Sequence, residues 1–323
     1  LAVLNSRGYQ FVDSKDGLIN VNDGRVWGIF DDSHMDADID RDNFHPAQPS
    51  IAEMTRKAIE ILSKDKDGFF LMVEGSQVDW AGHANDPLYM ITDFLAFDKA
   101  VKEAMNFVKN NPNTMVLVFP DHDTGALSIG HQQSDTVPSY IDTTVEDLVA
   151  PIAGGTITIN GLVSKFPENP TPADIRNTFV EYWGDFWSIM TDQEANDIIA
   201  LGTDSYAIAE YISANFTVFG WTTHGHNGID VPLWSYTKNE NLRPVGLFDN
   251  TELAKIVANI YRVKLNDSGA WVEINDDVLD MTDKTNPIAV VDGIMYPVAK
   301  DIRILPNGKV QNLNDLTLWA PET

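Results

Sequence analysis

Short apolar runs alternate with amphipathic stretches along much of the chain, and this pattern predicts an α/β fold. The runs at residues 69–73, 115–119 and 217–221 are expected to be buried strands. Between the first two, residues 87–110 place apolar side chains at helical spacing and predict one long helix. Strand, helix and strand in this order predict a parallel pair with a right-handed crossover.

Further patterns predict the remaining elements. A Ser-capped start predicts a helix after Pro49, and helix starts are also expected at Pro172, Thr191 and Asn250. Alternation or short β-branched runs predict strands at residues 26–30, 154–159 and 231–236 and a hairpin at residues 303–310.

Each of the three apolar runs at residues 69–73, 115–119 and 217–221 is followed by side chains that can bind metal. These are Glu74, Asp79 and His83 after the first run, Asp121 and His122 after the second, and His224 and His226 after the third. In open α/β sheets, ligands bind beyond the carboxyl ends of the strands. Asp79 and His83 are four residues apart, so one helical turn places both on one face. The pattern favours a metal site at one edge of the fold.

Composition narrows the possible chemistry. The chain has a formal net charge of −26 and no basic patch, which argues against nucleic-acid binding. It has no cysteine, so any metal must be bound by oxygen and nitrogen donors. No apolar run approaches the length of a membrane span, and the first ten residues lack the architecture of a signal peptide.

The acid-rich segment at residues 31–43 invites a calcium-loop interpretation, which the spacing does not favour. Arg41 occupies the position where such a loop needs glycine, and Ala47 occupies the position of the closing glutamate. We therefore expect a solvated loop, with His34 and His45 not bound to metal.

Three motifs together resemble the metal-binding segments of the alkaline phosphatases. They are VEGSQVDWAGH, FPDHDTG and HNGIDVP, and they occur in the family's order. The resemblance extends from about Gly8 to Val263. It implies an α/β, alkaline-phosphatase-like sheet with flanking helices. Residues 1–263 would form the C-terminal part of the catalytic domain, with an insertion at about residues 126–218. Residues 264–323 would form a small β-rich extension.

The resemblance implies two zinc ions and one magnesium ion. It assigns Asp79, His83 and His226 to the first zinc, Asp121 and His122 to the second, and Glu74 to magnesium. His224 competes with His226 for the third position, but the family's spacing to Asp230 favours His226. His224 then becomes a neighbour of the ligands, as do Trp80, Asp123 and Thr124. Trp80 stands where other members have His or Lys, and Asp123-Thr124 stands where many have a second histidine.

The implied activity is hydrolysis of phosphate monoesters through a phosphoserine. No serine in this chain matches the nucleophile motif, so we expect the chain to be a C-terminal portion that supplies most metal ligands. The nucleophile would then belong to an N-terminal segment, which is a possible partner. A homodimer and a periplasmic or secreted location are also expected from the family. Alternatives are a catalytically inactive metal-binding or interaction module and a related phosphomutase or sulfatase-type metalloenzyme.

Overall fold

The structure is a computed structural model that describes residues 1–130, 144–263, 279–280, 282, 288–297 and 302–312. It divides into two compact units, Leu1–Leu247 and Phe248–Thr323. The domain limits expected from the sequence, 1–263 and 264–323, stay a prediction.

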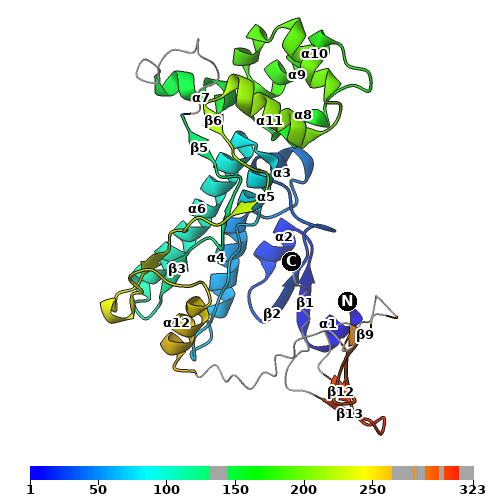
Figure 1. Ribbon diagram of the computed structural model, residues 1–323. Helices are drawn as coiled ribbons and strands as arrows, with labels where there is room; N and C mark the ends of the chain where they lie inside the picture. The colour runs from blue at the N-terminus through cyan, green and yellow to red at the C-terminus, as the bar shows by residue number, and fades with distance from the viewer. Residues whose placement is uncertain (131–143, 264–278, 281, 283–287, 298–301, 313–323) are drawn as a thin grey trace. The chain divides into compact units, whose positions relative to one another are not determined.

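Helices predominate in the larger unit, as Figure 1 shows. The helices of the described residues are α1 Ala2–Ser6, α2 Lys15–Asn20, α3 Asp38–Phe44, α4 Ile51–Leu62, α5 Gln77–Ala84, α6 Pro87–Asn110, α7 Val145–Ala153, α8 Ile159–Val163, α9 Pro172–Trp183, η1 Asp185–Ile189, α10 Asp192–Ala200, α11 Ser205–Phe216, η2 Glu240–Leu242 and α12 Glu252–Tyr261. The strands are β1 Tyr9–Val12, β2 Arg25–Gly28, β3 Val116–Val118, β4 Asp123–Thr124, β5 Ser128–Ile129, β6 Phe219–Gly220, β7 His226–Asn227, β8 Trp234–Tyr236, β9 Leu279–Asp280, β10 Ile288–Val291, β11 Ile294–Pro297, β12 Ile302–Ile304 and β13 Val310–Asn312.

The long helix predicted at residues 87–110 is confirmed as α6, which begins and ends at those residues. Asp86 is its N-cap, and Oδ1 of Asp86 accepts hydrogen bonds from the amides of Leu88 at 3.0 Å and Tyr89 at 3.1 Å. The helix starts predicted after Pro49, at Pro172 and at Thr191 are confirmed, and each has a reciprocal capping box, with Ser50, Thr171 and Thr191 as N-caps. The helix predicted from Asn250 begins at Glu252, and its N-cap, Thr251, makes no side-chain cap bond. Local sequence therefore determines these helix starts.

The predicted buried strand at residues 69–73 is wrong. The segment is not a strand, and no strand of the described residues pairs with it. Its side chains alternate between partly buried and exposed, with Phe70 64% and Met72 72% exposed. A strand requires backbone hydrogen bonds to a neighbouring strand, and an apolar sequence alone does not supply them. The predicted parallel pair is therefore also wrong: β3 pairs antiparallel with β8.

The region expected to be an insertion, residues 126–218, is largely helical in its described part. Figure 1 shows α8, α9, α10 and α11 grouped together. Trp183, Trp187 and Phe179 are fully buried among them and form a small aromatic core. The strand predicted at residues 154–159 is wrong, because Thr158 instead caps α8 through its hydroxyl, which accepts from the amide of Gly161 at 3.0 Å. His131, an isolated histidine that we do not expect to bind metal, lies outside the described residues.

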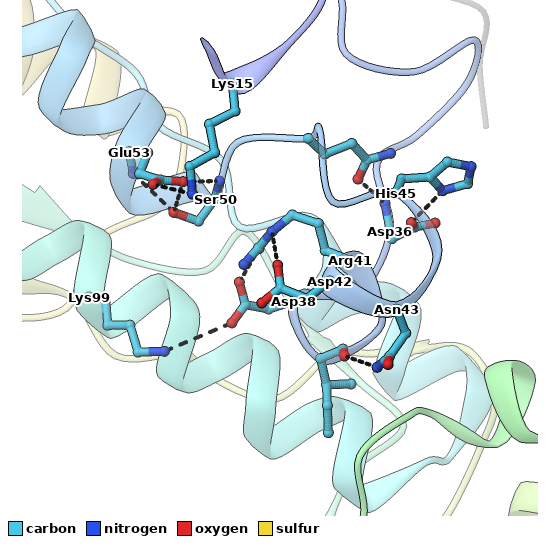
Figure 2. A network of polar contacts seen from close by, with 12 residues as sticks. Lys15, Asp36, Asp38, Arg41, Asp42, Asn43, His45, Ser50, Glu53 and Lys99 are labelled. Atoms are coloured by element: carbon cyan, nitrogen blue, oxygen red, sulfur yellow. Dashed lines mark hydrogen bonds and ion pairs between the residues drawn. The ribbon is translucent and has the colours of Figure 1, made fainter. Parts of the chain in front are cut away.

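The acid-rich segment is more ordered than the expected solvated loop, because Asp38–Phe44 forms α3. Figure 2 shows its polar network: Asp38 pairs with Arg41 and lies 3.9 Å from Lys99, and His45 lies 2.6 Å from Asp36. Asp40 is buried, and its two oxygens accept from the amide and hydroxyl of Thr158 at 2.8 and 2.6 Å. The predicted loop is therefore partly a helix whose acidic side chains are bonded within the protein.

The smaller unit contains α12 and an antiparallel sheet of five strands in the order β13-β12-β11-β10-β9. The hairpin predicted around Asn307-Gly308 is confirmed by the pairing of β12 with β13. Gly308 has a φ of +78°, which glycine adopts without strain. The expected β-rich C-terminal extension is thus present in the described residues.

Candidate metal centre

Helix α5, which bears Asp79 and His83, packs unusually closely on β4, the strand that follows Asp121 and His122. A Cβ added to Gly82 of α5 would lie 2.7 Å from the carbonyl oxygen of Thr124 in β4. From the other side, a Cβ on Gly125 would lie 2.8 Å from the carbonyl oxygen of Gly82. Because neither glycine has a side chain, backbone meets backbone here and the two sets of ligands approach each other.

The segment that contains His226 is held next to Asp121 and His122 by a short antiparallel pair of strands, β4 and β7. In β4 and β7, Asp123 lies opposite Asn227, and Thr124 lies opposite His226. The Asn227 side chain donates a hydrogen bond to Oδ2 of Asp123, which fixes the register. About a hundred residues of sequence separate these strands, so sequence periodicity does not show that they pair.

The result is a cluster of nitrogen and oxygen donors. Nε2 of His226 lies 3.2 Å from Nε2 of His83 and 3.4 Å from Oδ1 of Asp79. Nε2 of His83 lies 3.3 Å from Oδ2 of Asp79. Ligand atoms of Asp79, His122 and His226 all lie within 4.8 Å of one another, a geometry that could hold a metal ion. The structure thus brings together four of the six residues expected to bind metal.

Hydrogen bonds orient two of the imidazoles. Nδ1 of His83 is bonded to the carbonyl oxygen of His224, so it must donate. The hydroxyl of Thr124 donates to Oδ1 of Asp79 at 2.5 Å and lies 3.2 Å from Nδ1 of His122, from which it then accepts. In neutral His83 and His122, Nε2 is therefore left with its lone pair, as metal binding requires. We infer these tautomers from the hydrogen-bond network.

Two other expected ligands lie at or beyond the margin of the cluster. Oδ2 of Asp121 lies 3.4 Å from Nε2 of His122, and the Asp121 side chain is mostly exposed. The ring of His122 stacks on that of His226, with centroids 3.5 Å apart. Glu74 is exposed, and within the described part of the chain it makes no hydrogen bond or ion pair to the cluster. Glu74 therefore remains separate from the group of four.

The expected neighbours of the ligands take distinct places. Trp80 stacks on His34 with centroids 4.7 Å apart, which agrees with a packing role. Oδ2 of Asp123 also accepts from the amide of Ala126 at 3.1 Å. His224 contacts His83 but not Asp79, since its Nε2 lies 3.4 Å from Oε2 of Glu210. Only Thr124 bridges two expected ligands directly.

The donor set fits a divalent cation. Lone pairs of two imidazoles and both oxygens of one carboxylate face a common space, and such acceptors repel one another unless a cation or a proton lies among them. Histidine nitrogen and carboxylate oxygen are zinc ligands, and carboxylate oxygen also suits magnesium. The residues therefore match the metals that the sequence motifs imply.

Among the described residues, three buried carboxyl groups lie outside this cluster. Burial raises the pKa of Asp86 to about 6 and that of Asp93 to about 7. Burial also raises the pKa of Asp40. Oδ2 of Asp86 accepts from the amide of Ile159 at 2.8 Å, and Asp93 accepts from the amide of Asp38. These groups join α3, α6 and α8 and are structural, because each already has hydrogen-bond partners.

Comparison with known proteins identifies one family. The family model described as alkaline phosphatase matches residues 2–263. Alkaline phosphatase 3 of Bacillus subtilis is 35% identical over 268 residues, which cover 80% of this chain and 54% of that protein. The repressible alkaline phosphatase of Saccharomyces cerevisiae is 31% identical over 297 residues, covering 81% of this chain and 50% of the relative. The chain thus spans about half the length of these relatives.

Solved structures agree on the fold. The crystal structure of Thermus thermophilus alkaline phosphatase superposes with a TM-score of 0.69 at 23% identity, covering 81% of this chain and 58% of the other. The cold-active alkaline phosphatase from Shewanella sp. superposes with a TM-score of 0.66 at 24% identity, covering 80% of this chain and 61% of the other. Within the described residues, no helix combines the length and the apolar character needed to cross a membrane.

Proposed function

Because the chain belongs to the alkaline phosphatase family, we propose that it supplies the metal-binding part of an enzyme that hydrolyses phosphate monoesters. The observation that best supports this is the convergence of Asp79, His83, His122 and His226 from three distant segments. These segments are the ones whose motifs resemble the family's metal-binding segments.

We assign Asp79, His83 and His226 to a first zinc ion, Asp121 and His122 to a second, and Glu74 to a magnesium ion. Asp79, His122 and His226 lie close enough together to hold one ion, and the family resemblance implies the others. Bound metal ions would stabilise the attacking and leaving oxygens of a phosphoryl transfer. The protein's own contribution is to orient these donors and to keep the Nε2 atoms of His83 and His122 unprotonated.

The serine nucleophile that the family resemblance implies would come from another polypeptide segment. None of the serines in the 323 residues matches that motif, and Ser76, within the first motif, is the N-cap residue of α5. We further propose a homodimer in the periplasm or outside the cell, with a phosphate monoester as substrate. The family resemblance supports these proposals.

The test is to join the chain to the part of Bacillus subtilis alkaline phosphatase 3 that it does not match. With zinc and magnesium present, the fusion should hydrolyse p-nitrophenyl phosphate, whereas the 323-residue chain alone should be slower by on the order of 10⁶-fold, as for loss of a nucleophile. An Asp79→Asn fusion is the matched inactive control. Full activity of the chain alone would contradict the proposal that the serine nucleophile lies outside these 323 residues.

The choice between the two histidines of the third motif is tested in the same fusion. His226→Ala should abolish turnover, whereas His224→Ala should retain turnover when zinc is in excess. The reason is that Nε2 of His226 faces Asp79 and His83, and Nε2 of His224 faces Glu210. The opposite result would exchange the two assignments.

A second candidate function is that of a metal-binding or interaction module without catalysis. The observation that favours it is the cluster of Asp79, His83, His122 and His226, which metal binding alone would need. A folded fusion that binds zinc but hydrolyses neither phosphate nor sulfate esters would support it. Faster cleavage of a sulfate ester would instead indicate the sulfatase-type alternative.

A further inference from the structure

His83 and His224 hold each other through a reciprocal pair of hydrogen bonds. Nδ1 of His83 donates to the carbonyl oxygen of His224, and Nδ1 of His224 donates to the carbonyl oxygen of His83 at 2.8 Å. The two residues are 141 positions apart in the sequence. Each imidazole therefore binds the backbone of the other segment, and the position of one ring depends on that of the other.

His224 is also contacted by two side chains of α11, a helix of the region expected to be an insertion. Oε2 of Glu210 lies 3.4 Å from Nε2 of His224, and the ring of Tyr206 stacks on the His224 ring at 6.2 Å between centroids and 17° between planes. The buried hydroxyl of Ser213 in α11 donates to the carbonyl oxygen of Asn85, which ends α5, at 2.9 Å. The helix α11 thus holds both His224 and the end of the helix that bears His83.

We propose that His224 is a positioning residue for His83, and that α11 of the inserted region acts through His224 to keep the metal centre assembled. This inference rests on the proposed metal-binding function and assigns the insertion a part in it. His224 does not bind the metal in this arrangement, because its Nδ1 is used by the His83 carbonyl and its Nε2 faces Glu210.

The physical reason is the tautomer of His83. A histidine that binds metal through Nε2 must hold its proton on Nδ1, and the acceptor of that proton also fixes the ring's orientation. Here the acceptor is the His224 backbone carbonyl, and the His224 side chain holds that backbone against α5. Losing such support around a metal ligand typically weakens metal affinity by about 10–100-fold.

The exposed contact between Glu210 and His224 is the weaker part of the support. The Glu210 side chain is 64% exposed and the pair is 3.4 Å apart, so it is screened by solvent. We therefore expect a larger effect from His224→Ala than from Glu210→Gln. The ordering of the two effects follows from the geometry and is itself testable.

The test measures zinc affinity of the full chain by competition with a chelator at pH 8, together with thermal unfolding of the metal-free protein. His224→Ala should bind zinc about 10–100-fold more weakly, and Glu210→Gln less than about 10-fold more weakly. His45→Asn and Glu168→Gln serve as matched controls, since they remove an imidazole and a carboxylate outside the described cluster, and their zinc affinity should not change.

A second readout separates positioning from general stability. Nitrogen-15 spectra of the histidine side chains in the metal-free protein should show His83 as the Nδ1-protonated tautomer. In His224→Ala, the same ring should become a mixture of tautomers. His224→Asn, whose amide can donate to the His83 carbonyl, should restore part of both the tautomer preference and the zinc affinity.

The outcomes distinguish this inference from the proposed function. If the wild-type chain binds zinc and His224→Ala binds it equally well with an unchanged His83 tautomer, the inference is wrong and the metal site stands. If the wild-type chain binds no zinc, the metal-binding proposal fails, and the tautomer of His83 still decides whether His224 positions it. A lower unfolding temperature without a change in tautomer or affinity would also overturn the inference.

Discussion

Gly82→Ala should move α5 away from β4 and weaken the metal centre. The added Cβ would lie 2.7 Å from the Thr124 carbonyl oxygen and 2.9 Å from the Thr124 Cβ. Ordinary contact begins near 3.4 Å, so the two elements must separate by about 0.7 Å. Backbone cannot rotate away as a flexible side chain can, and the displaced helix bears both Asp79 and His83.

Two effects of opposite sign determine the change in stability. Alanine favours a helix over glycine by about 1 kcal/mol, whereas overpacking a closely packed site destabilises by about 1–3 kcal/mol. We expect a net destabilisation of up to about 2 kcal/mol. Zinc affinity should fall more clearly, because metal–ligand distances tolerate only about 0.2 Å, and the displacement exceeds that.

Urea unfolding and zinc competition measure these two quantities. Gly228→Ala is the matched control, since a Cβ there meets nothing within 4 Å and the backbone is not in the left-handed region. It should change stability by less than about 0.5 kcal/mol. A Gly82→Ala chain with wild-type zinc affinity would show that the close contact of α5 with β4 does not set the geometry of the centre.

Three further predictions concern the rest of the molecule. Asp93 has a pKa raised to about 7, so its contribution to stability is present below about pH 4 and is lost as pH rises through 7. At pH 8, the free energy of unfolding of Asp93→Asn, measured with urea, should therefore be higher than that of wild type by on the order of 2–4 kcal/mol. At pH 4 the two values should converge, and a difference that does not depend on pH would contradict this. Trp183→Ala should destabilise by about 3–5 kcal/mol, because it removes a fully buried ring whose Nε1 donates to Ile157 at 2.8 Å, and chemical denaturation would detect it. Removing zinc with a chelator should lower the unfolding temperature, since zinc at 100 times its Kd adds about 2.7 kcal/mol, and an unchanged temperature would argue against metal binding.

The helices could be predicted from the sequence because their signals are local. Asp86 and Pro87 define the start of α6, and the Ser50–Glu53 and Thr191–Glu194 pairs satisfy the first amides of α4 and α10. Such interactions connect residues three positions apart and need no knowledge of the fold. Strands differ, since the apolar run at residues 69–73 has no partner strand in the described residues.

Four of the six residues expected to bind metal could be placed together only by the structure, and the contacts that hold them could not be anticipated at all. The family resemblance suggested Asp79, His83, His122 and His226 together with Asp121 and Glu74, and the structure brings the first four together. The reciprocal bonds of His83 and His224 and the contact of Gly82 with Thr124 join residues far apart in sequence. A glycine gives no apolar or charge signal, so periodicity could not reveal that Gly82 lies at a backbone contact.

The strands at the two ends of the region expected to be an insertion, residues 126–218, show how so long a segment can leave the ligands in register. The chain leaves the site through β5 and returns through β6, and these strands pair with Ser128 opposite Gly220 and Ile129 opposite Phe219. The two ends of this region are therefore adjacent, and β4 and β7, which pair separately, lie next to them along the chain. Since the entropy of closing a loop rises only slowly with its length, a helical unit with its own core can be inserted there at little energetic cost. The same geometry lets α11, the last helix before β6, reach back to His224 and the end of α5.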